Sequence, residues 1–160
     1  MVRQPNKQEA RHAARLASVQ ALYQMDMAGT DLNDVVDEFV SYRFKQDDGT
    51  YGKRSPDATF FSELLRGVIR CQRDIDPVVD KQLATGWRLV RVDSIVRAIL
   101  RVALFELLER PDVPARVVIN EYINVAHAFF DDDEPKVVNG VLDRLARQYR
   151  AAEFDQPTGQ

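Results

Sequence analysis

The chain has 160 residues, of which 45% are hydrophobic and 29% are charged, and its formal net charge is -3 at pH 7. This composition indicates a globular protein of one domain and excludes fibrous, disordered and membrane-embedded classes. The single cysteine, Cys71, cannot form an internal disulfide, so we expect a cytoplasmic protein. The polar N-terminus lacks the apolar core of a secretion signal, and no apolar run approaches the ~18 residues that span a bilayer.

Apolar residues recur at intervals of three and four along the N-terminal half, which predicts amphipathic helices. The first predicted helix covers residues 8–27, which are rich in Ala, Leu, Gln and Arg, and Gly29 follows where a C-terminal cap would lie. A shorter helix is predicted at residues 32–44. Residues 45–56 contain two glycines and a proline, which predicts a surface loop.

Helical periodicity continues through the C-terminal half. It predicts a helix over residues 57–73, with Asp57 as its N-cap. Residues 93–109 are apolar around most of the helix circumference, which is typical of a central, buried helix. Two further helices are predicted to begin at Pro114 and Pro135, because proline is favoured in the first turn of a helix.

Alternating apolar and polar residues, which would indicate strands, are absent from the sequence. We therefore expect an all-α fold, a compact bundle of about seven helices that forms one domain over residues 1–150. A flexible tail is expected at residues 151–160. The number of helices depends on residues 75–91, where Pro77 and Gly86 interrupt the pattern.

A basic stripe follows the first predicted helix. Lys7, Arg11 and Arg15 are spaced by four residues, so a helix places them along one side, with His12 beside them. This segment is basic although the whole chain is acidic. Such a stripe is either a solvated helix face or an edge that binds phosphates, and charge alone slightly favours the solvated face.

Motifs of catalysis are lacking, and we expect no enzymatic activity, no metal and no cofactor. The sequence has no glycine-rich phosphate loop and no nucleophile motif. His12 and His127 are the only histidines, and neither has ligands at zinc-site spacing. The acidic run at residues 131–134 precedes a predicted helix, where acids cap free amides and oppose the helix dipole. A surface for docking a partner is the alternative interpretation of this run.

Three residues are unusual for their predicted helical surroundings. Arg97 and Arg101 lie on the mostly apolar central helix, so each must reach water, a carboxylate such as Glu106, or a ligand. Pairing with a carboxylate is the favoured interpretation. Gly140 lies inside the last predicted helix, where it costs about 1 kcal/mol relative to alanine, and a close approach of two helices would explain it.

Four strings carry a resemblance to a known family, in this order: ARHAARLASVQALYQMD at residues 10–26, RAILRVALFELL at 97–108, VPARVVINEYINVAHAFF at 113–130, and KVVNGVLDRLAR at 136–147. Their order and spacing resemble the NusB family of transcription antitermination factors. The resemblance implies an all-helical fold of two small subdomains without catalysis. It also implies binding to boxA, a single-stranded segment of ribosomal RNA leader transcripts, together with NusE, a small-subunit ribosomal protein. With other Nus factors, such a complex lets RNA polymerase read through terminators.

The resemblance also implies roles for individual residues, by their positions. RNA contacts are expected where an aromatic face can stack on a base or a cation can meet a phosphate. The residues implied for RNA are Lys7, Arg11, His12, Arg15, Phe129 and Lys136, and those implied for the protein partner are Tyr23 and Asp133.

An alternative function is a homodimeric helical module for protein–protein interaction without specific RNA binding, because some members of the family form homodimers. In that case the basic stripe is only solvated. If the stripe binds RNA, replacing Arg11 and Arg15 with alanine should weaken binding. Thermal stability should then change little, because exposed charges contribute little to folding.

Overall fold

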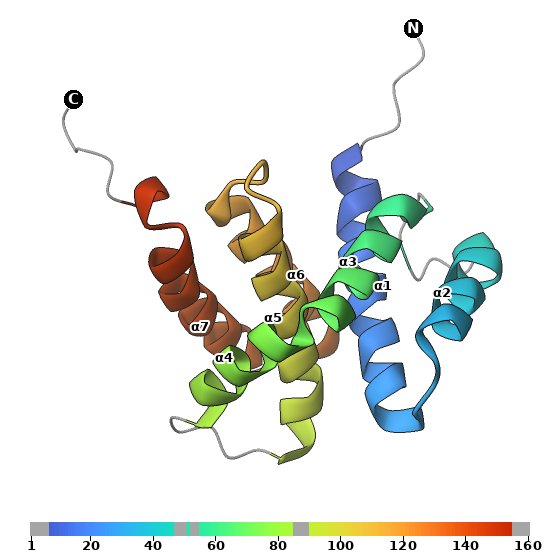
Figure 1. Ribbon diagram of the computed structural model, residues 1–160, viewed down its shortest axis with the longest axis horizontal. Coiled ribbons are helices and arrows are strands. Elements are labelled where there is room, and N and C mark those ends of the chain that lie inside the picture. The colour runs from blue at the N-terminus through green and yellow to red at the C-terminus, as the bar shows by residue number, and fades with distance from the viewer. Residues whose placement is uncertain (1–6, 47–50, 52–54, 85–89, 155–160) are drawn as a thin grey trace, which may run out of the picture. The chain divides into compact units, whose positions relative to one another are not determined.

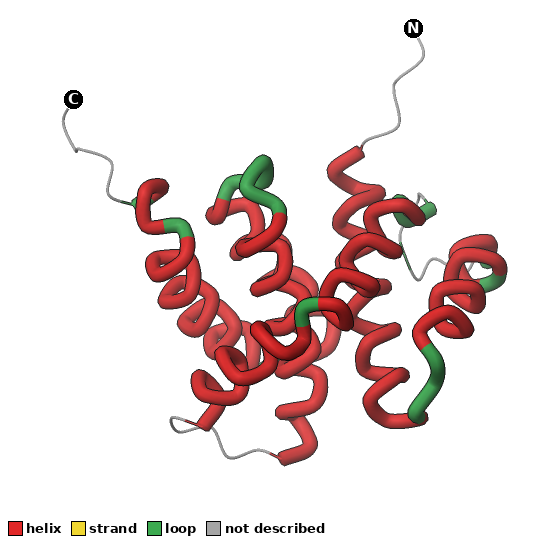
Figure 2. Tube along the Cα trace, in the orientation of Figure 1, coloured by secondary structure: helices red, strands yellow, loops and turns green. Residues whose placement is uncertain are grey.

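The computed structural model describes residues 7–46, 51, 55–84 and 90–154, with the side chains at 84 and 90–93 left undescribed. These ranges contain seven α-helices, two short 3₁₀ helices and no strand (Figure 2). The predicted all-α class is therefore confirmed. None of the described helices is both long enough and apolar enough to cross a membrane.

The chain divides into two compact units, residues 1–70 and residues 71–160. Figure 1 labels the helices of both units along the chain. In the first unit, the rings of Phe39 and Phe61 stack with centroids 5.4 Å apart, and Phe44 meets Phe61 edge to face at 5.0 Å. These aromatic contacts form the centre of its core. The elements of this unit are α1 (Lys7–Ala28), α2 (Leu32–Ser41), η1 (Arg43–Lys45) and α3 (Ala58–Arg70).

Two predicted helix caps of the first unit are confirmed. Gly29 adopts φ +68°, a left-handed conformation that favours glycine, and its N–H donates to the Met25 carbonyl at 2.9 Å. Asp57 precedes α3, and its Oδ1 accepts from the Phe60 N–H at 3.0 Å. The Asp57 N–H in turn donates to the carbonyl of Ala10 in α1, at 3.0 Å. This bond joins the N-terminal turns of α1 and α3.

The helix predicted at residues 32–44 is shorter than expected. α2 ends at Ser41, and a 3₁₀ turn follows at Arg43–Lys45. The Arg43 guanidinium lies 4.4 Å from the centre of the Phe39 ring, and its Nε donates to Glu38 Oε2 at 2.7 Å. Its Nη2 also donates to Gln24 Oε1 on α1, at 2.9 Å. These contacts with α1 and α2 stabilise the 3₁₀ helix, and α2 therefore does not continue to residue 44.

The second unit is built around α5, as predicted for a central, buried helix. α5 contacts α4, α6 and α7, and the α5 side chains from Ala98 to Leu107 are buried. This arrangement explains why its sequence is apolar around most of its circumference. The elements of this unit are α4 (Gln72–Ala84), α5 (Val90–Glu109), α6 (Ala115–Phe129), α7 (Glu134–Tyr149) and η2 (Ala151–Glu153).

The uncertain segment at residues 75–91 begins as a helix. α4 continues through Pro77, which is exposed, while Ile75 and Val79 on the same helix are fully buried. Burial of these apolar side chains offsets the backbone hydrogen bond that proline cannot donate. Gly86 lies outside the described residues.

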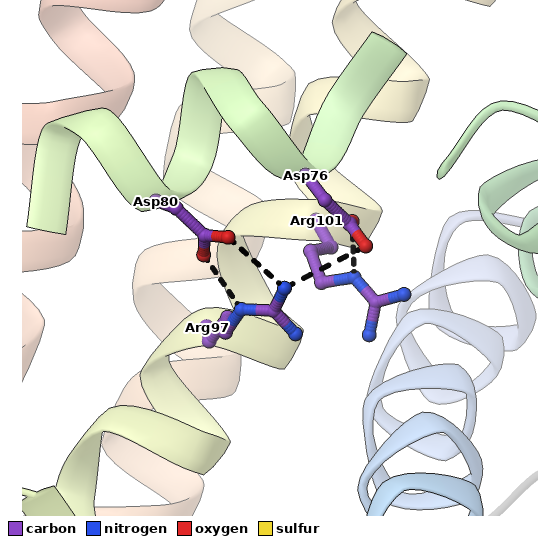
Figure 3. A network of polar contacts seen from close by, with 4 residues as sticks. All are labelled: Asp76, Asp80, Arg97 and Arg101. Atoms are coloured by element: carbon purple, nitrogen blue, oxygen red, sulfur yellow. Dashed lines mark hydrogen bonds and ion pairs between the residues drawn. The ribbon is translucent and has the colours of Figure 1, made fainter. Parts of the chain in front are cut away.

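Arginine–aspartate pairs join α4 to α5 (Figure 3). Arg97 Nε lies 2.7 Å from Asp80 Oδ1, and Arg101 Nε lies 2.8 Å from Asp76 Oδ1. Pairing with carboxylates is therefore confirmed, and the carboxylates of Asp76 and Asp80 belong to α4. Glu106, the carboxylate suggested from the sequence, is fully buried and accepts from the Tyr122 hydroxyl at 2.8 Å.

The first residues of the predicted tail are ordered as a 3₁₀ helix at Ala151–Glu153, and residues 155–160 lie outside the described residues. Arg150 donates to the carbonyls of Leu107 at 2.7 Å, Arg110 at 2.8 Å and Val113 at 3.0 Å. Arg150 also pairs with Glu153, whose Oε1 accepts from the Ala115 N–H at 2.8 Å. Pro114, the N-cap of α6, provides no side-chain cap, so Glu153 satisfies an amide of the first turn.

The helix-approach explanation of Gly140 is wrong within the described part of the chain. A Cβ atom built on Gly140 would meet only Arg144 Nη1, 3.7 Å away on α7 itself. No second helix among the described residues approaches closely enough to require glycine at this position.

Candidate nucleic-acid interface

The basic residues predicted on α1 differ in exposure. Lys7 is exposed, Arg11 and His12 are half-buried, and Arg15 is only 3% exposed. A regular helix does place these residues along one side, but the exposure of that side falls over two helical turns, from Lys7 to Arg15. The expectation that both arginines are exposed is therefore wrong for Arg15.

Phe60 on α3 explains the positions of both arginines. The guanidinium carbon of Arg11 lies 4.9 Å from the centre of the Phe60 ring, and that of Arg15 lies 5.1 Å away. Phe60 itself is 2% exposed, so the cations rest on an aromatic ring held in the core. Cation–π contacts of this kind are worth about 0.5–2 kcal/mol, more where the cation is desolvated.

The contact of Phe60 with the basic stripe was not predicted from the sequence. Asp57 places this ring, because its carboxylate caps the Phe60 N–H and its own N–H bonds to Ala10 on α1. The two helices are thereby brought together where the arginines lie. A contact between residues so far apart in sequence has no local signal that could have predicted it.

A second group of predicted site residues lies in the second unit, where α6 ends and α7 begins. Phe129 is half-buried, with its ring centre 6.4 Å from that of Phe130. Lys136 is exposed, and its Nζ lies 3.9 Å from Asp133 Oδ1. Both side chains of this ion pair are more than 80% exposed, so it contributes little to stability.

The acidic run before α7 caps that helix only in part. Asp133 occupies the N-cap position, and its main-chain carbonyl accepts from the Val137 N–H at 3.1 Å. Its carboxylate makes no capping bond and stays at the surface. The adjacent Glu134 is buried, and its Oε1 has no hydrogen-bond partner among the described residues. The three aspartates of the run are exposed, which leaves them accessible to a partner.

The predicted site residues thus form one group in each unit. Tyr23 is half-buried on α1, in the same unit as Lys7, Arg11, His12 and Arg15. Phe129, Lys136 and Asp133 belong to the second unit. The first group holds cations on a rigid helix beside the partial positive charge of its N-terminus, an arrangement that attracts anions such as phosphates.

The chain thus belongs to a class of helical proteins that have two compact units and a basic first helix. The model of the NusB family matches residues 12–147, and the chain belongs to this family.

Relatives and solved structures agree with this assignment. The transcription antitermination protein NusB of Allorhizobium ampelinum is 56% identical over 142 residues, covering 88% of each chain. That of Sinorhizobium fredii is 53% identical over 150 residues, covering 92% of each. The structure of T. maritima NusB superposes with a TM-score of 0.71 and 29% identity, covering 96% of this chain and 99% of that one. A protein chain in the crystal structure of a plectonemic RNA supercoil gives a TM-score of 0.69 and 25% identity, covering 89% and 98%.

Proposed function

We propose that this protein is a transcription antitermination factor that binds boxA RNA of ribosomal RNA leader transcripts together with NusE. In this role it acts with other Nus factors on RNA polymerase, so that transcription passes terminators. The proposal is supported by the family and by relatives whose name is transcription antitermination protein. The similar chain found in a crystal structure of RNA supports a nucleic acid as the ligand.

The observation that carries the proposal is the support of Arg11 by the Phe60 ring, one helical turn after the exposed Lys7. A guanidinium that rests on a fixed ring loses less side-chain entropy when it binds a phosphate than a free one does. Lys7 adds a second cation on the same face of α1. Arg15, which is buried, supports this arrangement by packing on the same ring and is proposed as a positioning residue.

Residues of the second unit are proposed to complete the contacts. The half-buried Phe129 ring is suited to stack on an unpaired base, and the exposed Lys136 is suited to meet a phosphate. Because the ion pair of Lys136 with Asp133 lies at the surface and is weak, exchanging that carboxylate for a phosphate costs little. Tyr23 and Asp133 are proposed to contact NusE.

A transcription assay with purified components tests this function. The template carries a boxA leader upstream of a terminator, and RNA polymerase, NusE and the other Nus factors are present. Adding this protein should increase readthrough on the boxA template but not on one with a scrambled boxA. Equal readthrough on both templates would contradict the proposal. A homodimer without RNA binding would then become the better description, and light scattering of the same sample would identify it.

A further inference from the structure

A groove of about 750 Å³ lies between α2 and α3, and none of the residues proposed to bind RNA or NusE lines it. Val36 and Val40, one turn apart on α2, supply apolar surface to the groove. Opposite them, α3 presents the small side chains of Ala58 and Ser62. Small residues on α3 leave the space between the two helices unfilled, and this is the origin of the groove.

A hydrogen bond joins the two helices at one end of the groove. Asn33, near the start of α2, accepts through Oδ1 from Arg66 Nη1, near the end of α3, at 2.9 Å. The basic residues Arg66 and Arg70 therefore lie at the end of the groove that contains Asn33. From Asn33 to Ser41 the wall formed by α2 extends about 12 Å, which is roughly two turns of a helix.

Arg66 is held in place but not neutralised. Its Nε donates to Ser62 Oγ at 3.1 Å, and its Nη1 donates to Asn33. Both acceptors are uncharged, and no carboxylate pairs with Arg66 among the residues that the structure describes. These bonds orient the guanidinium and do not use Nη2, which suits Arg66 to receive an external carboxylate.

Acidic residues follow one turn further along the groove. Asp37 and Glu63 line it from opposite helices, and both are exposed. Asp37 Oδ1 accepts from the neutral hydroxyl of Ser41, at 3.0 Å. The groove thus presents a basic end, an acidic middle and an apolar wall. The acidic middle disfavours RNA, because phosphates would face two carboxylates.

We propose that this groove binds an amphipathic helix of a protein partner. An acidic residue of that helix faces Arg66, a basic residue about one turn away faces Asp37 and Glu63, and apolar residues at i and i+4 pack on Val36 and Val40. The pattern matches the general mode in which an amphipathic helix enters an apolar groove. The opposed charges determine the direction in which the helix binds, because the reversed orientation would place like charges together.

Selection from a displayed library of 16-residue helix-forming peptides tests this proposal on the full chain. Peptides enriched on the wild-type protein are synthesised, and their affinities are measured by fluorescence anisotropy. We expect them to carry the acidic, basic and apolar pattern described above. Arg66→Glu and Val40→Asp should each weaken binding at least about tenfold. Arg116→Glu, at an exposed arginine on α6, is the matched control and should leave the affinity unchanged.

Three results would overturn the proposal. The first is a selection that yields no peptide specific for the groove, either because none is enriched or because the enriched peptides bind Arg66→Glu and wild type with equal affinity. The second is a 15-nucleotide RNA whose binding is lost in Arg66→Ala, which would assign the groove to RNA. The third is a wild-type dimer that Arg66→Glu dissociates in sedimentation, which would assign it to a second copy of the chain. Circular dichroism melting checks that each variant folds, and boxA binding by Arg66→Glu tests the proposed RNA function separately.

Discussion

Arg101 on α5 and Asp76 on α4 form a partly buried ion pair, with Arg101 Nε 2.8 Å from Asp76 Oδ1 and the arginine side chain 3% exposed. Asp76 also lies 3.6 Å from Arg97 Nη2, so one carboxylate serves two guanidinium groups (Figure 3). Removing that carboxylate takes an ion-pair partner from the buried guanidinium of Arg101 and another from Arg97, which is more costly than losing a surface pair.

Asp76→Ala is therefore expected to lower the free energy of unfolding by about 3 kcal/mol. Asp80→Ala is the matched control, because Asp80 pairs with Arg97 at the surface with its side chain 53% exposed, and should cost less than about 1 kcal/mol. Urea unfolding followed by circular dichroism measures both values. Equal losses in the two variants would show that the burial of Arg101 does not increase the contribution of its ion pair to the free energy of unfolding.

The Tyr122 hydroxyl gives a second test of the core. It donates to Glu106 Oε1 at 2.8 Å, and both residues are fully buried. Tyr122→Phe removes this donor from a buried carboxylate and should cost about 1–3 kcal/mol. Tyr149→Phe, at an exposed tyrosine on α7, should change stability by less than about 0.5 kcal/mol. A Tyr122→Phe protein as stable as wild type would contradict the importance of this bond.

The lowered pKa of Glu153 predicts how the stability of the fold depends on pH. The Ala115 amide, and then the Arg150 guanidinium, lower the pKa of Glu153 below its ordinary value of 4.5. A lowered pKa in the folded state means that the ionised carboxylate stabilises the fold above pH 4.5. This contribution is lost as the pH falls from 4.5 through the lowered pKa.

Unfolding of wild type and Glu153→Gln between about pH 3 and pH 7 measures this contribution. The stability difference between the two proteins should be largest near neutral pH and should shrink below pH 4.5. A difference that stays constant over the whole range would contradict the role of the ionised carboxylate.

The two arginines on α1 differ in burial, so replacing each with alanine should have a different effect on stability. Arg15→Ala should lower the free energy of unfolding by about 1–2 kcal/mol, because it removes packing from the Phe60 ring. Arg11→Ala, at a half-buried arginine, should cost less and should weaken RNA binding directly. Thermal melting and RNA binding of both single variants measure these effects. The reverse order of stabilities would show that Phe60 does not distinguish the two side chains.

Features that depend on local sequence were predicted well. The Gly29 and Asp57 caps, and the central position of α5, all follow from residue type and periodicity. The end of α2 at Ser41 was missed, because Arg43 gains contacts with α1 and Phe39 that helix propensity does not include.

Prediction of the candidate site from the sequence was limited in the same way. The spacing of the basic residues correctly indicated a helix, but spacing alone cannot show that the side of α1 at Arg15 faces the core. Likewise the charge of Arg101 predicted a carboxylate partner, whereas its identity as Asp76, 25 residues earlier, depends on how α4 packs against α5. Such contacts are determined by tertiary packing and leave no signal in a single sequence.

The proposed recognition of boxA is tested by a salt titration of binding to boxA RNA and to a scrambled RNA of equal composition, each with and without NusE. We expect selective binding to boxA that tightens when NusE is added. Three or four phosphate contacts predict a slope of roughly -2 to -3 in a plot of log affinity against log salt concentration. Weak and equal binding to both RNAs, unchanged by NusE, would contradict a role in boxA recognition.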